Sequence, residues 1–318
     1  RVASENAFDS AQYWLKEMIP EWDGVERVKH LCSKYMGVDT TDLPYIESVA
    51  LYAMTAHAGR ILVPGIKADM VPVLMGREGF RKTSVIEVIA PDEDCFAEIS
   101  FNDSDAENLR KSRGCIAVEC SELQGLGNRD GDSSKSFISR RFEKHTAKYE
   151  EHASRTDRRF IFWGTSNDTR FLSDKETDNR RWLPMLTTRD SDPEGVVEIR
   201  EQLWAEAREL FLKHGVMYQE AEELAKPHRE KATSHDPWRE KIEDALATIK
   251  GPDGILLGER DYIEPEIVWS DILGIVAANR TNANAKRLAN VMRNVGYEIS
   301  ISRVNGKPRR VYASTNLQ

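Results

Sequence analysis

The sequence of 318 residues predicts an α/β fold followed by a smaller domain of helices and a β-hairpin. Three short apolar runs each end abruptly in polar residues, and helical or loop segments separate them. This pattern is typical of a parallel sheet whose polar residues collect at one edge. A polar stretch flanked by proline, "AKPHREKATSHDPW", then precedes a basic tail, and this change of composition predicts a second domain.

Residues 1–67 are expected to form an N-terminal helical segment. The stretch "AQYWLKEMIPEWDGVERVKHLCSKYMG" carries apolar residues three and four positions apart, and "LPYIESVALYAMTAHAGRIL" repeats the pattern after a proline at its start. We expect these helices to form a small bundle or a cap on the sheet domain.

Residues 68–225 are expected to form that sheet domain. Its predicted strands are "MVPVLMG", "GCIAVECSEL" and "RRFIFWGTSN", and a glycine- and serine-rich loop, "GNRDGDSSKS", lies between the second and the third. A helix over "SVIEVIA" follows the first strand, and the helix "ARELFLKHG" closes the domain. The stretch "GREGFRKTS", Gly76–Ser84, therefore lies between a strand and a helix.

This strand–loop–helix context is the one that a phosphate-binding loop requires. The stretch reads Gly, four residues, Arg-Lys-Thr, where the loop of nucleotide hydrolases has Gly in place of Arg81. Lys82 would bring its charge to the β- and γ-phosphates of ATP, and Thr83 would hold Mg²⁺. The predicted ATP-binding residues are Gly76, Gly79, Arg81, Lys82, Thr83 and Ser84.

Polar residues at the ends of the other two predicted strands would complete such a site. A magnesium-dependent phosphoryl site needs a carboxylate for the metal and a polar group that orients the attacking water. Glu119 ends the second apolar run and Glu122 follows it closely, while Asn167 ends the third. We predict catalytic roles for all three and a metal site at Thr83 and Glu119. The alternatives are two solvated acids in a turn and an asparagine that caps a turn or helix.

Arg180 and Arg181 follow an acidic loop in "SDKETDNRRWLPM". A guanidinium is planar and permanently charged, so it is well suited to neutralise phosphate. We predict that these arginines contact phosphate, and the alternative is a pair of surface salt bridges.

Taken in order, four motifs resemble one known family. The succession "EWDGVERV", "PVLMGREGFRKTS", "GCIAVECSEL" and "FIFWGTSNDTRFLSDKETDNRRWLPM" is similar to the virulence-associated protein E family of phage, prophage and plasmid replication proteins, which are relatives of the superfamily-three helicases. The resemblance covers about residues 12–215. It implies a P-loop NTPase core of the AAA+ and helicase-like type that uses ATP and Mg²⁺.

The resemblance also implies roles for individual residues. Lys82 and Thr83 would bind phosphate and magnesium, the two glutamates would serve metal and water, and Asn167 would be a sensor. Arg180 or Arg181 would act on the ATP of a neighbouring subunit. The chain departs from the family at Arg81, where relatives have Gly, and in "RRFEKHTAKYEEHASRTDRR", which replaces a basic segment containing aromatic residues.

Residues 236–318 predict a winged helix, because short helices precede a hairpin around Asn305 and Gly306. From Trp269 to Gln318 there are eight Lys and Arg against two acids, whereas the whole chain has a net charge of −8. Concentrated positive charge on a recognition helix and a wing predicts contact with nucleic acid, and the alternative is a winged helix that docks on protein. The predicted contacts are Lys286, Arg287, Arg293, Arg303, Lys307, Arg309 and Arg310.

Composition sets the remaining expectations. The sequence has no apolar run of membrane-spanning length and no secretory signal, which favours a cytoplasmic protein without a membrane partner. Its four cysteines form no Cys-x-x-Cys pair and are expected to be reduced packing residues. Because the first residue is not Met, we expect a piece of a longer polypeptide, and in relatives a primase part often lies upstream.

These observations favour an ATP-dependent DNA motor that resembles a helicase and acts in the replication of a mobile element. We expect a homo-oligomeric ring, such as a hexamer, on single-stranded or forked DNA. One alternative is a nucleotide-sensing DNA-binding protein that has lost hydrolysis, for which Arg81 is the reason. A small-molecule phosphotransferase is a third possibility, but it leaves the basic tail and Asn179-Arg180-Arg181 unexplained.

Overall fold

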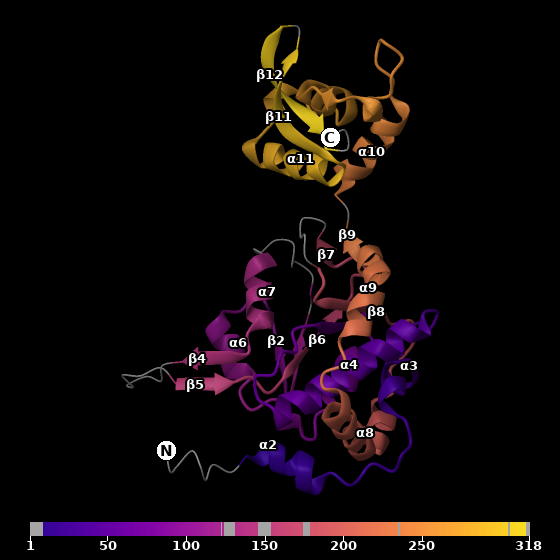
Figure 1. The fold of residues 1–318 in the computed structure, drawn as a ribbon, viewed down its shortest axis with the longest axis vertical. Coiled ribbons are helices and arrows are strands. Elements are labelled where there is room, and N and C mark those ends of the chain that lie inside the picture. The colour runs from indigo at the N-terminus through magenta and orange to yellow at the C-terminus, as the bar shows by residue number, and fades with distance from the viewer. Residues whose placement is uncertain are drawn as a thin grey trace. The chain divides into compact units, whose positions relative to one another are not determined.

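A computed structural model describes residues 9–121, 123, 131–145, 154–173, 179–234, 236–304 and 306–315. The chain divides into two compact units, Arg1–Thr233 and Ser234–Gln318 (Figure 1).

Unit 1 is built on a parallel sheet of five strands. The order across the sheet is β2-β3-β6-β1-β8, and every neighbouring pair runs parallel. The strands are β1 (Val71–Met75), β2 (Phe96–Ile99), β3 (Ala117–Cys120), β6 (Ile161–Ser166) and β8 (Trp182–Leu186). The predicted α/β class is confirmed, and β1, β3 and β6 are the three strands that the sequence predicted. Their carboxyl ends meet at one edge, because parallel strands point the same way.

Helices cover both faces of this sheet. One core joins the strands to α4 (Leu43–Leu62), α5 (Lys82–Glu87) and α8 (Pro193–His214). The second core includes buried side chains of α7 (Gly131–Ser139), and Leu109 of α6 (Asp105–Lys111) packs against it. Residues 131–136, expected to belong to a loop, therefore lie in a helix whose Phe137 and Ile138 are buried.

Helix α4 lies deep in the first core. Pro44 occupies its first turn, where a missing N–H costs nothing, and the Asp42 side chain accepts a hydrogen bond from the Tyr45 N–H at 3.4 Å. Fifteen of its 20 residues are buried. The helix is therefore buried on nearly all sides, as expected of an element enclosed in a core.

The chain before α4 is less helical than its periodicity predicts. It forms α2 (Ser10–Tyr13), the π-helical turn η1 (Trp14–Met18), the 3₁₀ turn η2 (Val28–His30) and α3 (Leu31–Tyr35). Pro20 and Gly24 lie in the non-helical stretch between them. Buried Glu206 of α8 accepts hydrogen bonds from the backbone N–H groups of Arg27 (2.5 Å) and Val28 (2.8 Å). The N-terminal helical segment thus shares its core with the sheet.

Smaller elements complete unit 1. They are η3 (Glu93–Cys95), the antiparallel hairpin of β4 (Phe142–His145) and β5 (Ser154–Asp157), the short pair β7 (Leu172–Ser173) and β9 (Thr233–Ser234), and α9 (Gln219–Lys231). The stretch expected as a linker from Ala225 onward is helical as far as Lys231 and contains Pro227 inside the helix.

Unit 2 combines helices with an antiparallel sheet of order β10-β12-β11. Its elements are α10 (Pro237–Thr248), η4 (Leu257–Glu259), β10 (Tyr262–Ile263), η5 (Ile267–Ile272), η6 (Ala277–Asn279), α11 (Asn282–Asn294), β11 (Tyr297–Val304) and β12 (Lys307–Ser314). The last two form the long hairpin visible in Figure 1. Ile242, Val268, Leu288 and Met292 are fully buried in a core of their own.

Candidate functional site

The predicted loop lies at the carboxyl edge of the sheet, between β1 and α5. The N–H of Gly76 donates to the Ser166 carbonyl at 3.0 Å, which ties the end of β1 to the end of β6. Gly76 has φ +150°, and a Cβ there would lie 2.4 Å from the Thr187 carbonyl oxygen. Only glycine fits this position, because any side chain would collide with backbone.

Lys82 begins α5 and its ammonium is turned into the loop. Its Nζ donates to the carbonyls of Gly76 (2.8 Å) and Arg77 (2.7 Å) and to Oδ1 of Asn167 (3.1 Å). Burial lowers the pKa of Lys82, while the charges of Glu119 and Glu78 oppose that shift. The structure thus brings together the predicted lysine and the predicted sensor asparagine.

Glu119 is buried at the end of β3 beside Thr83. One carboxylate oxygen, Oε1, accepts from the Thr83 hydroxyl at 3.1 Å and from the Thr165 hydroxyl. The other, Oε2, is buried with no hydrogen-bond partner among the described residues. Burial is the largest influence on the pKa of Glu119 and raises it to about 7; the two hydroxyl donors act in the opposite direction.

These groups line one pocket of about 420 Å³. Its lining consists of Glu78, Gly79, Phe80, Arg81, Lys82, Thr83, Ser84, Glu119, Ser121, Thr165, Ser166 and Asn167. Mg²⁺ prefers oxygen ligands, and the unpaired Oε2 of Glu119 next to a threonine hydroxyl offers such a set. The predicted residues Thr83 and Glu119 therefore fit a magnesium ion. Glu122, the other predicted carboxylate, lies outside the described residues.

Arg81 takes the left-handed backbone conformation that the usual glycine would take. Its φ of 55° and ψ of 33° make it the one non-glycine residue with positive φ in the described part of the chain. Its guanidinium binds the Glu194 carboxylate with both terminal nitrogens, one at 2.8 Å and the other closer. The side chain is thus engaged by the first turn of α8.

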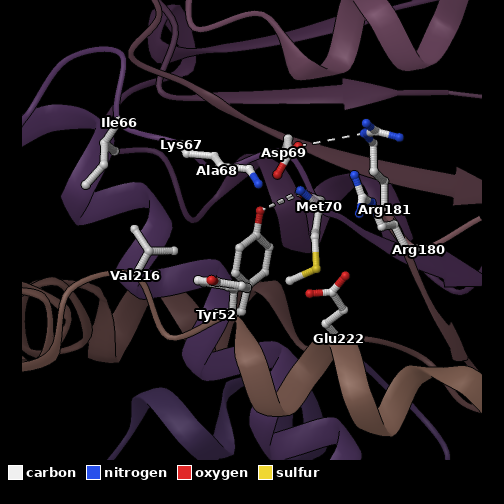
Figure 2. A pocket seen from close by; sticks show the side chains of 11 residues that line it. Tyr52, Ile66, Lys67, Ala68, Asp69, Met70, Arg180, Arg181, Val216 and Glu222 are labelled. Atoms are coloured by element: carbon white, nitrogen blue, oxygen red, sulfur yellow. Dashed lines mark hydrogen bonds and ion pairs between the residues drawn. The ribbon is translucent and has the colours of Figure 1, made fainter.

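Arg180 and Arg181 lie at the opposite edge of the sheet. They directly precede β8, whereas Lys82 follows the end of β1, and these two strands are parallel neighbours. Figure 2 shows both arginines at a second pocket of about 350 Å³. Arg181 donates to Ser139 Oγ at 2.9 Å and faces Asp69 at 3.8 Å. Within one chain, the structure does not bring the predicted arginines to the loop.

The predicted nucleic-acid contacts divide into two groups. Lys286 and Arg293 of α11 are exposed, and so are four residues of the hairpin: Arg303, Lys307, Arg309 and Arg310. Arg287 is different. It forms two hydrogen bonds of 2.7 Å with Asp236, and its guanidinium lies 4.0 Å from the centre of the Trp238 ring. Arg287 therefore also packs within unit 2, and its role as a contact residue stays a prediction.

Three residues of the site were not identified from the sequence. Thr165 donates to Glu119, Glu98 lies opposite Glu119 in the register of β2 and β3, and Glu194 holds Arg81. Thr165 stands two residues before Asn167 in "TSN", so a strand-end motif could have revealed it. Glu194 is far from the loop in sequence and no local pattern points to it.

Fold and site define an α/β protein with a lysine-bearing loop and a buried carboxylate at the carboxyl edge of a parallel sheet. More particularly, the chain belongs to the virulence-associated protein E-like family, whose domain model matches residues 15–234. No protein with a curated description matches it significantly.

Solved structures of similar fold include two of the NrS-1 C-terminal region. The A-form apo structure is 16% identical with a TM-score of 0.58, and another apo structure is 13% identical with a TM-score of 0.59. Each match covers 94% of this chain and 78% of the other. At such identities the likeness concerns the fold alone. No helix in the described part of the chain is long and apolar enough to cross a membrane.

Proposed function

We propose that the chain is a magnesium-dependent ATPase that drives a helicase-like DNA motor in the replication of a phage, prophage or plasmid. The observation that carries this proposal is the convergence of Lys82, Thr83 and Glu119 in one pocket at the carboxyl edge of a parallel sheet. Ligands of open α/β sheets bind at this edge. Family membership supports the connection with replication.

In this proposal the loop residues change partners when ATP binds. Lys82 leaves the carbonyls of Gly76 and Arg77 for phosphate oxygens. This exchange is favourable because a negatively charged oxygen binds the buried ammonium more strongly than a neutral carbonyl does. Mg²⁺, held by Thr83 and Glu119, would neutralise charge on the β- and γ-phosphates. Asn167 remains beside Lys82 and orients the attacking water through its side-chain amide.

Glu119 is also suited to receive a proton from that water. As long as no metal is bound to it, a carboxyl group with a pKa of about 7 is half ionised at neutral pH, and a general base works best when its pKa lies near the operating pH. The buried Oε2 atom has no described partner, so it is the oxygen available for metal or water.

The position of Arg180 and Arg181 supports an assembly in which each ATP lies between two copies of the chain. The five residues of β8 span about 16 Å at the usual rise of a strand and separate these arginines from the carboxyl edge. An arginine from a neighbouring copy would then complete the phosphate site. We propose a homo-oligomeric ring, such as a hexamer.

Unit 2 is proposed as a winged helix that binds DNA. Its order of helix, strand, helical turns, helix and hairpin is the order of that motif, with α11 as the recognition helix and β11–β12 as the wing. Exposed Arg303, Lys307, Arg309 and Arg310 concentrate positive charge on the wing. We therefore expect the hairpin to supply more phosphate contacts than α11 does.

The proposal is tested by ATPase rates with and without single-stranded DNA, together with the particle mass in the same buffer. We expect DNA-stimulated hydrolysis that Lys82→Ala abolishes. Lys213→Ala, which removes an exposed lysine near the end of α8, is the matched control and should hydrolyse ATP like the wild type. Equal turnover by wild type and Lys82→Ala would refute the proposal.

A nucleotide-sensing DNA-binding protein without hydrolysis is the second candidate. Arg81 favours it, because a side chain stands where the usual loop has glycine. This candidate expects Arg81→Gly to raise ATP turnover without changing DNA affinity. Turnover by the wild type at ordinary motor rates would exclude it.

A further inference from the structure

The loop is fastened to the start of α8 at two adjacent points. The Ser191 N–H donates to the Phe80 carbonyl at 3.1 Å, and the Arg81 guanidinium binds Glu194 through both terminal nitrogens. One attachment is backbone and the other is side chain. Together they connect the nucleotide loop to a helix that begins seven residues after β8 ends.

The segment that receives these attachments is itself fixed. The Asp192 N–H donates to the Tyr35 carbonyl at 2.7 Å, and the Asp192 side chain caps α8 by accepting from the Gly195 N–H at 3.0 Å. The Thr187 N–H donates to the Met75 carbonyl at 2.7 Å. Glu194 therefore projects from a well-anchored helix start and adds a side-chain attachment to the backbone hydrogen bond that already ties the loop there.

Arg81 needs such a restraint more than glycine would. A side chain disfavours the left-handed region, so a residue other than glycine stays there only when its surroundings impose it. Arg81 directly precedes Lys82, and its carbonyl accepts the first-turn hydrogen bond from the Val85 N–H at 3.1 Å. The backbone of Arg81 thus sets the direction in which Lys82 and the start of α5 point.

Resting on the function proposed above, we infer that Arg81 is a positioning residue that acts through Glu194. The pair holds the phosphate loop in the conformation seen here before nucleotide arrives and keeps the guanidinium away from the phosphates. In this chain the ion pair holds position 81 in the left-handed backbone conformation, which glycine adopts without such a restraint. Hydrogen bonds from Arg81 also lower the pKa of Glu194, so the carboxylate stays charged at neutral pH.

Amide hydrogen exchange in the nucleotide-free, full-length chain tests this inference. The amides of Val85 and Ser191 report on the loop directly, because each donates to a carbonyl of Arg81 or Phe80. We expect Arg81→Ala and Glu194→Gln each to speed their exchange by about two- to fivefold, the range for an exposed ion pair. The double variant should exchange no faster than either single variant.

Two further variants separate charge from backbone conformation. Arg81→Gly lacks the ion pair but tolerates positive φ, so its exchange should be slower than that of Arg81→Ala. Arg280→Ala is the matched control, because Arg280 and Glu266 form a similar two-nitrogen pair in unit 2 (2.6 and 2.7 Å). It should leave exchange at Val85 and Ser191 at the wild-type rate.

The result that overturns the inference is equally definite. Unchanged exchange in Glu194→Gln, or effects of the two single variants that add in the double variant, would show that Arg81 does not act through Glu194. Affinity for a fluorescent ADP analogue is measured in parallel. Loss of affinity in Arg81→Ala with none in Glu194→Gln would instead make Arg81 a direct phosphate ligand. Failure of the wild type to bind the analogue would refute the proposed function and leave the exchange result intact.

Discussion

Replacing Glu119 by glutamine should stabilise the metal-free protein at alkaline pH and have little effect at acid pH. Burial raises the pKa of Glu119 from 4.5 to about 7. Below pH 4.5 the carboxyl group is protonated in both folded and unfolded chains, so its contribution to stability is fully present. As the pH rises from 4.5 to 7, the unfolded chain releases its proton while the folded chain keeps it, so that stability is lost and is gone once the pH has passed 7. The two pKa values differ by about 2.5. Since a difference of one in pKa is worth about 1.4 kcal/mol, the full loss in unfolding free energy is about 3.5 kcal/mol.

Urea denaturation of wild type and Glu119→Gln at pH 5 and pH 8 measures this difference. We expect the variant to gain about 2.5 kcal/mol over the wild type between the two pH values, because glutamine does not ionise and because part of the wild-type loss has already occurred at pH 5. Excess Mg²⁺ should return most of that stability to the wild type at pH 8 by pairing with the carboxylate, and should do nothing for the variant. A difference between the two proteins that is the same at both pH values would refute the reasoning.

Three other predictions concern the arginines and the wing. Arg287→Ala should lower the unfolding free energy of unit 2 by about 1–2 kcal/mol, since it removes a charged hydrogen-bonded pair and a cation–π contact. Thermal melting measures this loss, and an unchanged melting midpoint would contradict it. Lys307→Glu with Arg310→Glu should weaken DNA binding and flatten its salt dependence, with log K against log[salt] losing about 1 of its slope for each phosphate contact removed. Arg180→Ala and Lys82→Ala, each inactive alone, should recover ATPase activity when mixed. In some mixed pockets one copy supplies an intact Lys82 and its neighbour an intact Arg180. No recovery of activity would argue against a shared site.

The sequence predicts the buried strands well, because full burial on both faces leaves an uninterrupted apolar run. It does not predict the two edge strands. Most of β2 is only partly buried, and the central Pro184 of β8 is typical of a chain that has left the sheet. The topology explains the proline: β8 is at the edge of the sheet and pairs with β1 alone. On the open side a missing N–H breaks no ladder, so proline is tolerated there.

The candidate site was predictable where its residues follow strand ends and unpredictable where they meet across the fold. Glu119 and Asn167 each stand at the end of an apolar run, and Lys82 stands in the loop-to-helix motif that follows another, so their convergence follows from a parallel sheet. The Arg81–Glu194 pair joins positions 113 residues apart, and no local pattern encodes it. The contacts of Arg287 with Asp236 and Trp238 likewise join separate elements of unit 2, and no local pattern predicts them.

The placement of Lys82 and Arg180 at opposite edges of one sheet also bears on how the protein would behave when diluted. If each catalytic pocket needs both edges, an isolated chain carries two half-sites and no whole one. Specific activity would then rise with protein concentration until assembly is complete.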